Sequence, residues 1–213
     1  MQAEFLSLIR LDLLFESISG IIALIVTIYA TKAYNLTGQK KLSDLSTGFL
    51  VLSVGMFGRV VGTWYFIIRY GLEGDSGDLV ISIVTIAYGA SRIMAYVLFL
   101  IATRPARYRE PMNGNSMAGM SFLLATILVD SSLEVIAILV LVAVVIQAII
   151  NYSSTRSRYA LYVFVGFFFI LLSHVQVAQT LSNPGMYLMS QLSQLIGFLS
   201  FLVLLYRTGK QNE

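Results

Sequence analysis

The chain contains six mostly apolar stretches, each long enough to cross a lipid bilayer as a helix. A spanning helix needs about 20 consecutive, mostly apolar residues. The six stretches cover residues 11–33, 43–68, 78–103, 133–151, 158–181 and 185–207. Charged residues make up only 12% of the 213 residues, against about 25% in a soluble domain. We therefore predict an all-α polytopic membrane protein in which residues 1–213 form one domain.

A shorter apolar stretch, Met117 to Val129, decides the topology. If it spans the membrane, most of the basic residues lie on one side: Lys32, Lys40, Lys41, Arg104, Arg107, Arg109, Arg156, Arg158, Arg207 and Lys210. If it does not, the basic residues divide between the two sides. Basic residues are concentrated in cytoplasmic loops. We therefore expect seven spans in the cell membrane, with the N-terminus outside and the C-terminus in the cytoplasm.

The sequence also contains an internal repeat. Positions 12–60 align with positions 130–178 without a gap. Ten positions are identical, and the six least common in membrane helices are Asp12 with Asp130, Glu16 with Glu134, Tyr34 with Tyr152, Thr37 with Thr155, and Gly48-Phe49 with Gly166-Phe167. We therefore expect two three-helix units, 11–103 and 131–207, joined by a linker helix at 116–130. Both units then point the same way, related by an axis along the membrane normal.

Two resemblances follow from this pattern. The residues Tyr34-x-Leu36-Thr37-Gly38 followed by Gly48-Phe49 resemble a helical hairpin of small archaeal and bacterial seven-helix membrane domains. Some of those domains are the input modules of sensory proteins, so this resemblance implies a sensory or accessory module. The layout of three, one and three helices is similar to that of the SWEET sugar transporters. The prolines that those transporters carry within their spans are missing here, because Pro105, Pro111 and Pro184 lie in loops.

Two carboxylate pairs occur near the outer ends of the first and fifth predicted spans. Asp12 and Glu16 are four residues apart and share one helix face, and Asp130 and Glu134 repeat this spacing. Carboxylates in a first helical turn can cap free N–H groups, and we expect this role for Asp12 and Asp130. Glu16 and Glu134 lie deeper, where either an ion pair or a ligand contact fits.

Two arginines lie inside the predicted spans, where an ionisable residue usually has a partner. We expect Arg59 to pair with Glu16, because the two lie at similar depth. Arg92 has no carboxylate at its own depth, so it must reach outward, bind backbone carbonyls or meet a ligand anion. These residues therefore have two possible roles: they form buried ion pairs that only support the structure, or they contact a ligand.

Further polar side chains fall in the outer half of the last two spans: His174, Gln176, Gln191 and Gln194. A single histidine is more often a hydrogen-bonded core residue than a metal ligand, and we expect the former for His174. Together with the acidic helix ends, these side chains are candidates for the lining of a polar outer vestibule.

Several function classes find no support in the sequence. It contains no cysteine and one histidine, so we expect no metal site and no cofactor. No catalytic set or nucleotide-binding motif occurs, so we expect no enzyme. The basic loops are what membrane topology requires, and we expect no nucleic-acid partner. We favour a non-enzymatic sensory, adaptor or accessory subunit that acts in the lipid bilayer through other membrane subunits or as a homo-oligomer. The alternative is a small-solute or ion transporter built from the two repeats.

Overall fold

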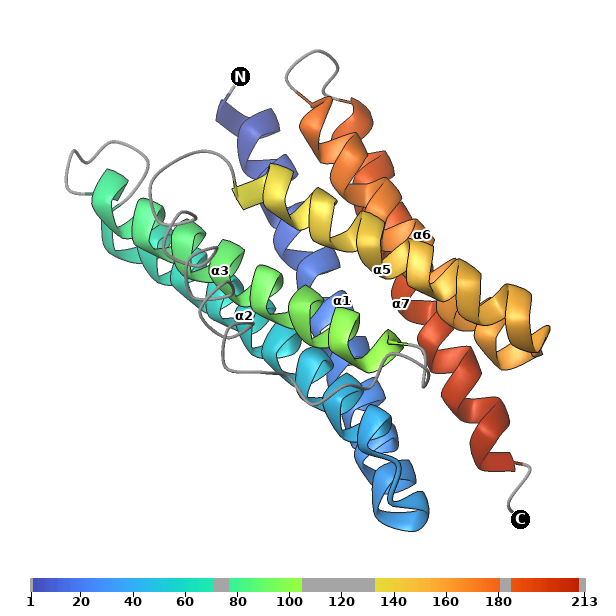
Figure 1. Ribbon diagram of the computed structural model, residues 1–213. Coiled ribbons are helices and arrows are strands. Elements are labelled where there is room, and N and C mark those ends of the chain that lie inside the picture. Colours follow the sequence, from blue (N-terminus) through green and yellow to red (C-terminus); the bar gives the residue numbers. More distant parts are fainter. Residues whose placement is uncertain (1, 71–76, 105–132, 181–184, 211–213) are drawn as a thin grey trace, which may run out of the picture.

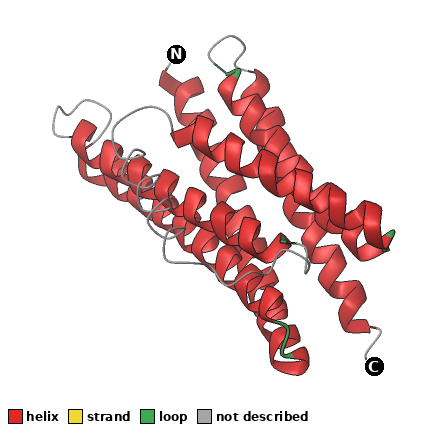
Figure 2. Cartoon of the chain, in the orientation of Figure 1, coloured by secondary structure: helices red, strands yellow, loops and turns green. Residues whose placement is uncertain are grey.

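The computed structural model describes residues 2–70, 77–104, 133–180 and 185–210 (Figure 1). Within these ranges the chain is helical apart from short connections (Figure 2). The helices are α1 (Gln2–Thr37), α2 (Lys40–Tyr70), α3 (Gly77–Thr103), α5 (Leu133–Thr155), α6 (Arg158–Ala178) and α7 (Gly185–Lys210). All six are long and apolar enough to cross a membrane. This confirms the six expected all-α spans, whereas Met117 to Val129 and the proposed linker at 116–130 lie outside the described residues.

Two tight turns join α1 to α2 and α5 to α6. At the first, Gly38 has a φ of 65° and donates its amide to the carbonyl of Tyr34 at 2.7 Å. At the second, Arg156 has a φ of 47° and donates its amide to the carbonyl of Tyr152 at 2.7 Å. A left-handed residue of this kind commonly ends a helix, because its amide satisfies a free carbonyl.

The main helix contacts form a closed ring. Each described helix packs on the next along the chain, including α3 on α5, and α7 packs on α1 to complete the ring. The helices α3 and α5 are parallel (Figure 1). Leu133 at the start of α5 lies against Gly89 in the middle of α3, and Thr103 at the end of α3 bonds to Gln147 further along α5. The start of α5 therefore lies beside the middle of α3, about 21 Å back along the bundle from Thr103.

The two ends of the bundle differ in charge. One end holds the start of α1, and we call it the N-terminal end (Figure 1). The opposite end holds the α1–α2 and α5–α6 turns and the last residues of α7. Its described basic residues are Lys32, Lys40, Lys41, Arg104, Arg156, Arg158, Arg207 and Lys210. We call this the basic end.

Four phenylalanines fill the centre of the bundle, one each from α2, α3, α6 and α7. Their ring centroids are 4.7 Å apart for Phe49 and Phe99, 5.2 Å for Phe99 and Phe167, 4.8 Å for Phe167 and Phe201, and 4.9 Å for Phe201 and Phe49. All four side chains are fully buried. We call this closed set the phenylalanine layer.

Glycines admit two of these rings. A Cβ built on Gly48 would lie 2.5 Å from the Phe99 ring, and one built on Gly166 would lie 2.5 Å from the Phe201 ring. Only glycine therefore fits at these two crossings. The layer owes its position to a Gly-Phe pair on α2 and another on α6, each of which faces a phenylalanine of the next helix.

Short polar side chains join neighbouring helices elsewhere in the bundle. Ser46 on α2 donates to the carbonyl of Thr27 on α1 at 3.1 Å. At the basic end, Asn151 on α5 donates to the carbonyl of Thr103 on α3 at 2.7 Å. Such bonds help to hold helices together within a bilayer, where burial of apolar surface does not drive their association.

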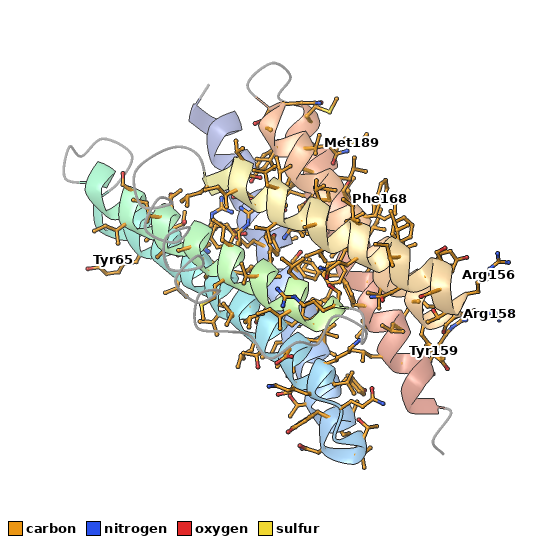
Figure 3. All side chains as sticks on the ribbon, viewed as in Figure 1. Tyr65, Arg156, Arg158, Tyr159, Phe168 and Met189 are labelled. Atoms are coloured by element: carbon orange, nitrogen blue, oxygen red, sulfur yellow. The ribbon has the colours of Figure 1, made fainter. Side chains whose placement is uncertain are left out.

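The outside of the bundle has the character of a lipid-facing surface. Tyr65, Phe168 and Met189 project away from the helices (Figure 3) and are exposed. Trp64 and Tyr65 lie in the last two turns of α2, toward the N-terminal end of the bundle, and Tyr206 lies at the basic end. Tryptophan and tyrosine are enriched at the two membrane–water interfaces, so this placement fits a helix bundle that crosses a bilayer.

Candidate functional site

The polar residues inside the bundle form two ion-pair clusters on the N-terminal side of the phenylalanine layer. The first cluster joins α1 and α2. Arg59 places Nη1 2.7 Å from Oε2 of Glu16 and Nη2 2.8 Å from Oδ2 of Asp12. The expected contact between Glu16 and Arg59 is therefore present. The Glu16 side chain is 2% exposed and that of Arg59 is 29% exposed, so the pair is buried with one open flank.

Helix α7 contributes to the first cluster. Gln191 donates from Nε2 to Oδ1 of Asp12 at 3.0 Å and to the hydroxyl of Tyr187 at 3.3 Å. Tyr187 and Gln191 are four residues apart and therefore share one face of α7. Asp12 thus accepts hydrogen bonds from two different helices.

The structure corrects the role expected for Asp12. Helix α1 begins at Gln2, so Asp12 lies almost three turns inside the helix rather than in its first turn. Its neighbouring amides are already bonded within the helix, and its carboxylate binds Arg59 and Gln191 instead. Glu134, which aligns with Glu16 in sequence, occupies the first turn of α5. Asp130 lies outside the described residues.

The second cluster joins α3, α5 and α6 around His174. Nδ1 of His174 contacts Oε1 of Glu134, and Nε2 lies 2.7 Å from Nη2 of Arg92 and 2.6 Å from the hydroxyl of Tyr96. Arg92 also lies 3.5 Å from Oε2 of Glu134. With a neutral imidazole, Nδ1 donates to the carboxylate, and the single lone pair of Nε2 accepts from the hydroxyl of Tyr96. Nη2 of Arg92 lies equally close to Nδ1, at 2.6 Å, and so is not directed at Nε2 alone.

These contacts settle two of the alternatives that the sequence leaves open. Arg92 reaches toward the N-terminal end and finds Glu134 and His174. His174 is a buried, hydrogen-bonded core residue. Among the described residues, no group of three His, Cys, Asp or Glu side chains has the arrangement of a metal site.

Tyr88 links the two clusters. Its ring centroid lies 5.1 Å from the guanidinium carbon of Arg59 and 5.0 Å from that of Arg92. A cation within about 6 Å of an aromatic centroid is attracted to the ring. One buried ring therefore holds two guanidinium groups that belong to different clusters.

We call the combined set the charged network: Asp12, Glu16, Arg59, Tyr88, Arg92, Tyr96, Glu134, His174, Tyr187 and Gln191. Every described helix contributes at least one member. Three carboxylates face two guanidiniums, so the fully ionised network with a neutral imidazole has one excess negative charge. A single proton neutralises it. Oε1 of Glu16 and the hydroxyl of Ser19, one helical turn away, are buried without a hydrogen-bond partner within the described part of the chain.

The residues Glu134, His174 and Tyr96 follow one another as carboxylate, imidazole and hydroxyl. In enzymes this order can activate a hydroxyl group. Here the hydroxyl belongs to a tyrosine that is 3% exposed, and His174 is 1% exposed. Packed in this way, the three groups form a hydrogen-bonded chain that can hold or pass a proton within the network.

Two of the candidate glutamines lie apart from the network. Gln176 on α6 accepts from the hydroxyl of Ser193 on α7 at 2.8 Å. Gln194 is half-buried on α7, and in the described ranges no hydrogen bond joins it to the network. Three tyrosines belong to the network without having been predicted. The signal for two of them was the spacing of Tyr88, Arg92 and Tyr96, which are successive at four residues and so share one face of α3.

The comparisons with known proteins give no relative for this arrangement. Comparison of the chain with protein-family models, with curated proteins and with solved structures found no match.

Proposed function

We propose that this protein is a non-enzymatic sensory, adaptor or accessory subunit of a membrane that acts through protein partners. One observation carries the proposal: the charged network is tied to every described helix but is separated from the basic end by the phenylalanine layer. A change of charge or hydration in the network therefore acts on all the described helices at once. The phenylalanine layer blocks the passage of ions and solutes from the network to the basic end.

Distances along the helices support the separation. Phe99 lies seven residues beyond Arg92, and Phe167 lies seven residues before His174. At a rise of 1.5 Å per residue, the layer lies about 10 Å from Arg92 and His174 in the direction of the basic end. The ring of Tyr96 lies between them, with its centroid 6.3 Å from that of Phe99. Its rings are in mutual contact and fully buried. Such packing fits a site that responds to conditions on the N-terminal side of the bundle. It fits less well with a continuous transport path through the bundle.

The finer topology is part of this proposal. We infer a seventh span within the chain between Thr103 and Leu133, because α3 and α5 are parallel and the chain must return from the end of α3 to the start of α5. Seven spans would place the N-terminus outside the cell and the basic end in the cytoplasm, in accord with the positions of the basic residues.

The matching contacts of the two three-helix units support an internal repeat. Gly48 receives Phe99 as Gly166 receives Phe201. The turns at Gly38 and Arg156 have the same pattern of hydrogen bonds. In each turn a backbone amide donates to a carbonyl four residues earlier, and a threonine hydroxyl, of Thr37 or Thr155, does the same. Parallel repeats of this type also occur in transporters, so these correspondences favour the alternative function of a small-solute or ion transporter.

Co-purification from native membranes in a mild detergent tests the proposal. We expect the chain to carry a membrane partner in fixed stoichiometry, either another subunit or a second copy. His174→Leu removes the acceptor that joins Tyr96 on α3 to α6 and should change the amount of bound partner. The control Val54→Ala alters a lipid-facing side chain and should not. A chain that purifies as a lone monomer in all three forms contradicts the proposal.

A further inference from the structure

An apolar groove runs along the outside of the bundle between α6 and α7, at the basic end. Its volume is about 530 Å³. Aliphatic side chains line it, with Leu161 and Val165 on α6 and Ile196, Leu199 and Val203 on α7. This volume lies within the range typical of small-molecule sites. The groove lies apart from the charged network and shares no residue with it.

Two arginines mark the basic end of the groove. Arg158 is the first residue of α6, and Arg207 lies at the end of the apolar part of α7. The guanidinium carbon of Arg207 lies 5.4 Å from the ring centroid of Tyr162, which orients this side chain beside the groove. Both arginines are exposed, and no described acidic side chain forms an ion pair with either of them. Within the described part of the chain, two positive charges without an ion-pair partner therefore flank one mouth of an apolar groove.

The length of the groove matches one leaflet of a bilayer. From Ile196 to Arg207 the helix rises about 16 Å, and half of the hydrocarbon core is about 15 Å thick. Arginines at the end of a span lie at the level of the lipid headgroups. The groove thus presents positive charge at headgroup depth and aliphatic surface below it.

We propose that this groove binds an anionic phospholipid, with its phosphate between Arg158 and Arg207 and an acyl chain along α6 and α7. Charge complementarity selects this occupant. A neutral lipid leaves both guanidiniums without an anion, and an apolar helix of a partner protein supplies no charge for them. Basic sites between spanning helices on the cytoplasmic side suit anionic headgroups.

Lipid-dependent stabilisation tests the charge requirement. We expect phosphatidylglycerol to raise the melting temperature of the detergent-solubilised full chain more than phosphatidylcholine does. Arg158→Ala with Arg207→Ala should weaken binding of phosphatidylglycerol about thirty-fold. The matched control, Lys32→Ala with Lys40→Ala, removes two exposed charges from the same end and should retain the preference. Equal stabilisation by the two lipids, or an equal loss in the control, overturns the proposal.

Fluorescence quenching tests the place of the acyl chain. In a Trp64→Phe background, Leu199→Trp puts the sole tryptophan in the groove, and Leu139→Trp puts it on an exposed face of α5. Phosphatidylglycerol with brominated chains should quench the groove position at lower lipid concentration than the control position. Equal quenching at both positions overturns the groove assignment. Stabilisation by glycerol phosphate equal to that by the lipid indicates a site for free phosphate and also overturns it.

Discussion

Replacing Arg59 by glutamine should destabilise the protein by about 3 kcal/mol, because it leaves Asp12 and Glu16 buried without their cation. Both carboxylates bind this one guanidinium, at 2.8 Å and 2.7 Å. No other described cation forms an ion pair with either of them. The free energy of unfolding, measured in detergent micelles through the fluorescence of the single tryptophan, Trp64, reports the loss.

A second substitution distinguishes loss of the ion pairs from nonspecific destabilisation of α2. Glu16→Gln removes one of the two stranded charges at constant shape, so Arg59→Gln with Glu16→Gln should be more stable than Arg59→Gln alone. Lys40→Gln removes an exposed charge from the start of the same helix and should change stability by less than about 0.5 kcal/mol. An Arg59→Gln protein as stable as the Lys40→Gln control is incompatible with the pairing described.

Truncation of Phe99 to alanine should destabilise the protein by about 3 kcal/mol, the low end of the usual range for this change. Lipid tails are as apolar as the bundle interior, so lost packing rather than transfer from water sets the cost. Phe99 is fully buried and contacts Phe49 and Phe167. Its removal therefore opens a cavity in the phenylalanine layer.

Phe168 provides the matched control for this truncation. It lies beside Phe167 on α6 but points away from the bundle (Figure 3) and is exposed. Phe168→Ala should therefore cost less than about 1 kcal/mol in the same unfolding measurement. Similar losses for Phe99→Ala and Phe168→Ala indicate that the layer adds nothing to stability, in conflict with its assigned role.

Hydropathy predicted the six spans well, because a bilayer forces apolar segments of sufficient length into helices. It also placed the start of the first span at residue 11, as in the structure, but it did not predict where helix α1 begins. The apolar stretch begins at residue 11, whereas the helix begins at Gln2. Hydropathy marks where a helix meets lipid, not where its hydrogen bonding begins. Because α1 begins earlier than its apolar part, Asp12 lies inside the helix. It therefore pairs with Arg59 and does not cap the helix as expected.

The charged network was predictable in part. Depth along the helices was enough to pair Glu16 with Arg59, since a buried cation needs a nearby anion. The partners of Arg92 depended on which helices are neighbours, and a single sequence does not specify helix order. The tyrosines were missed for a related reason: an aromatic residue in a span looks like core packing until the hydroxyl or ring is placed beside a charge.

Proton entry into proteoliposomes tests the central claim most directly, because the network holds a chain of proton-carrying groups that ends short of the phenylalanine layer. Vesicles of the purified chain, loaded with a pH-sensitive dye, are driven by an imposed membrane potential. We predict that protons enter no faster than into protein-free vesicles, for the native protein and for His174→Gln alike. Faster entry with the native protein, lost in His174→Gln, would contradict the account and establish a conducting path through the bundle.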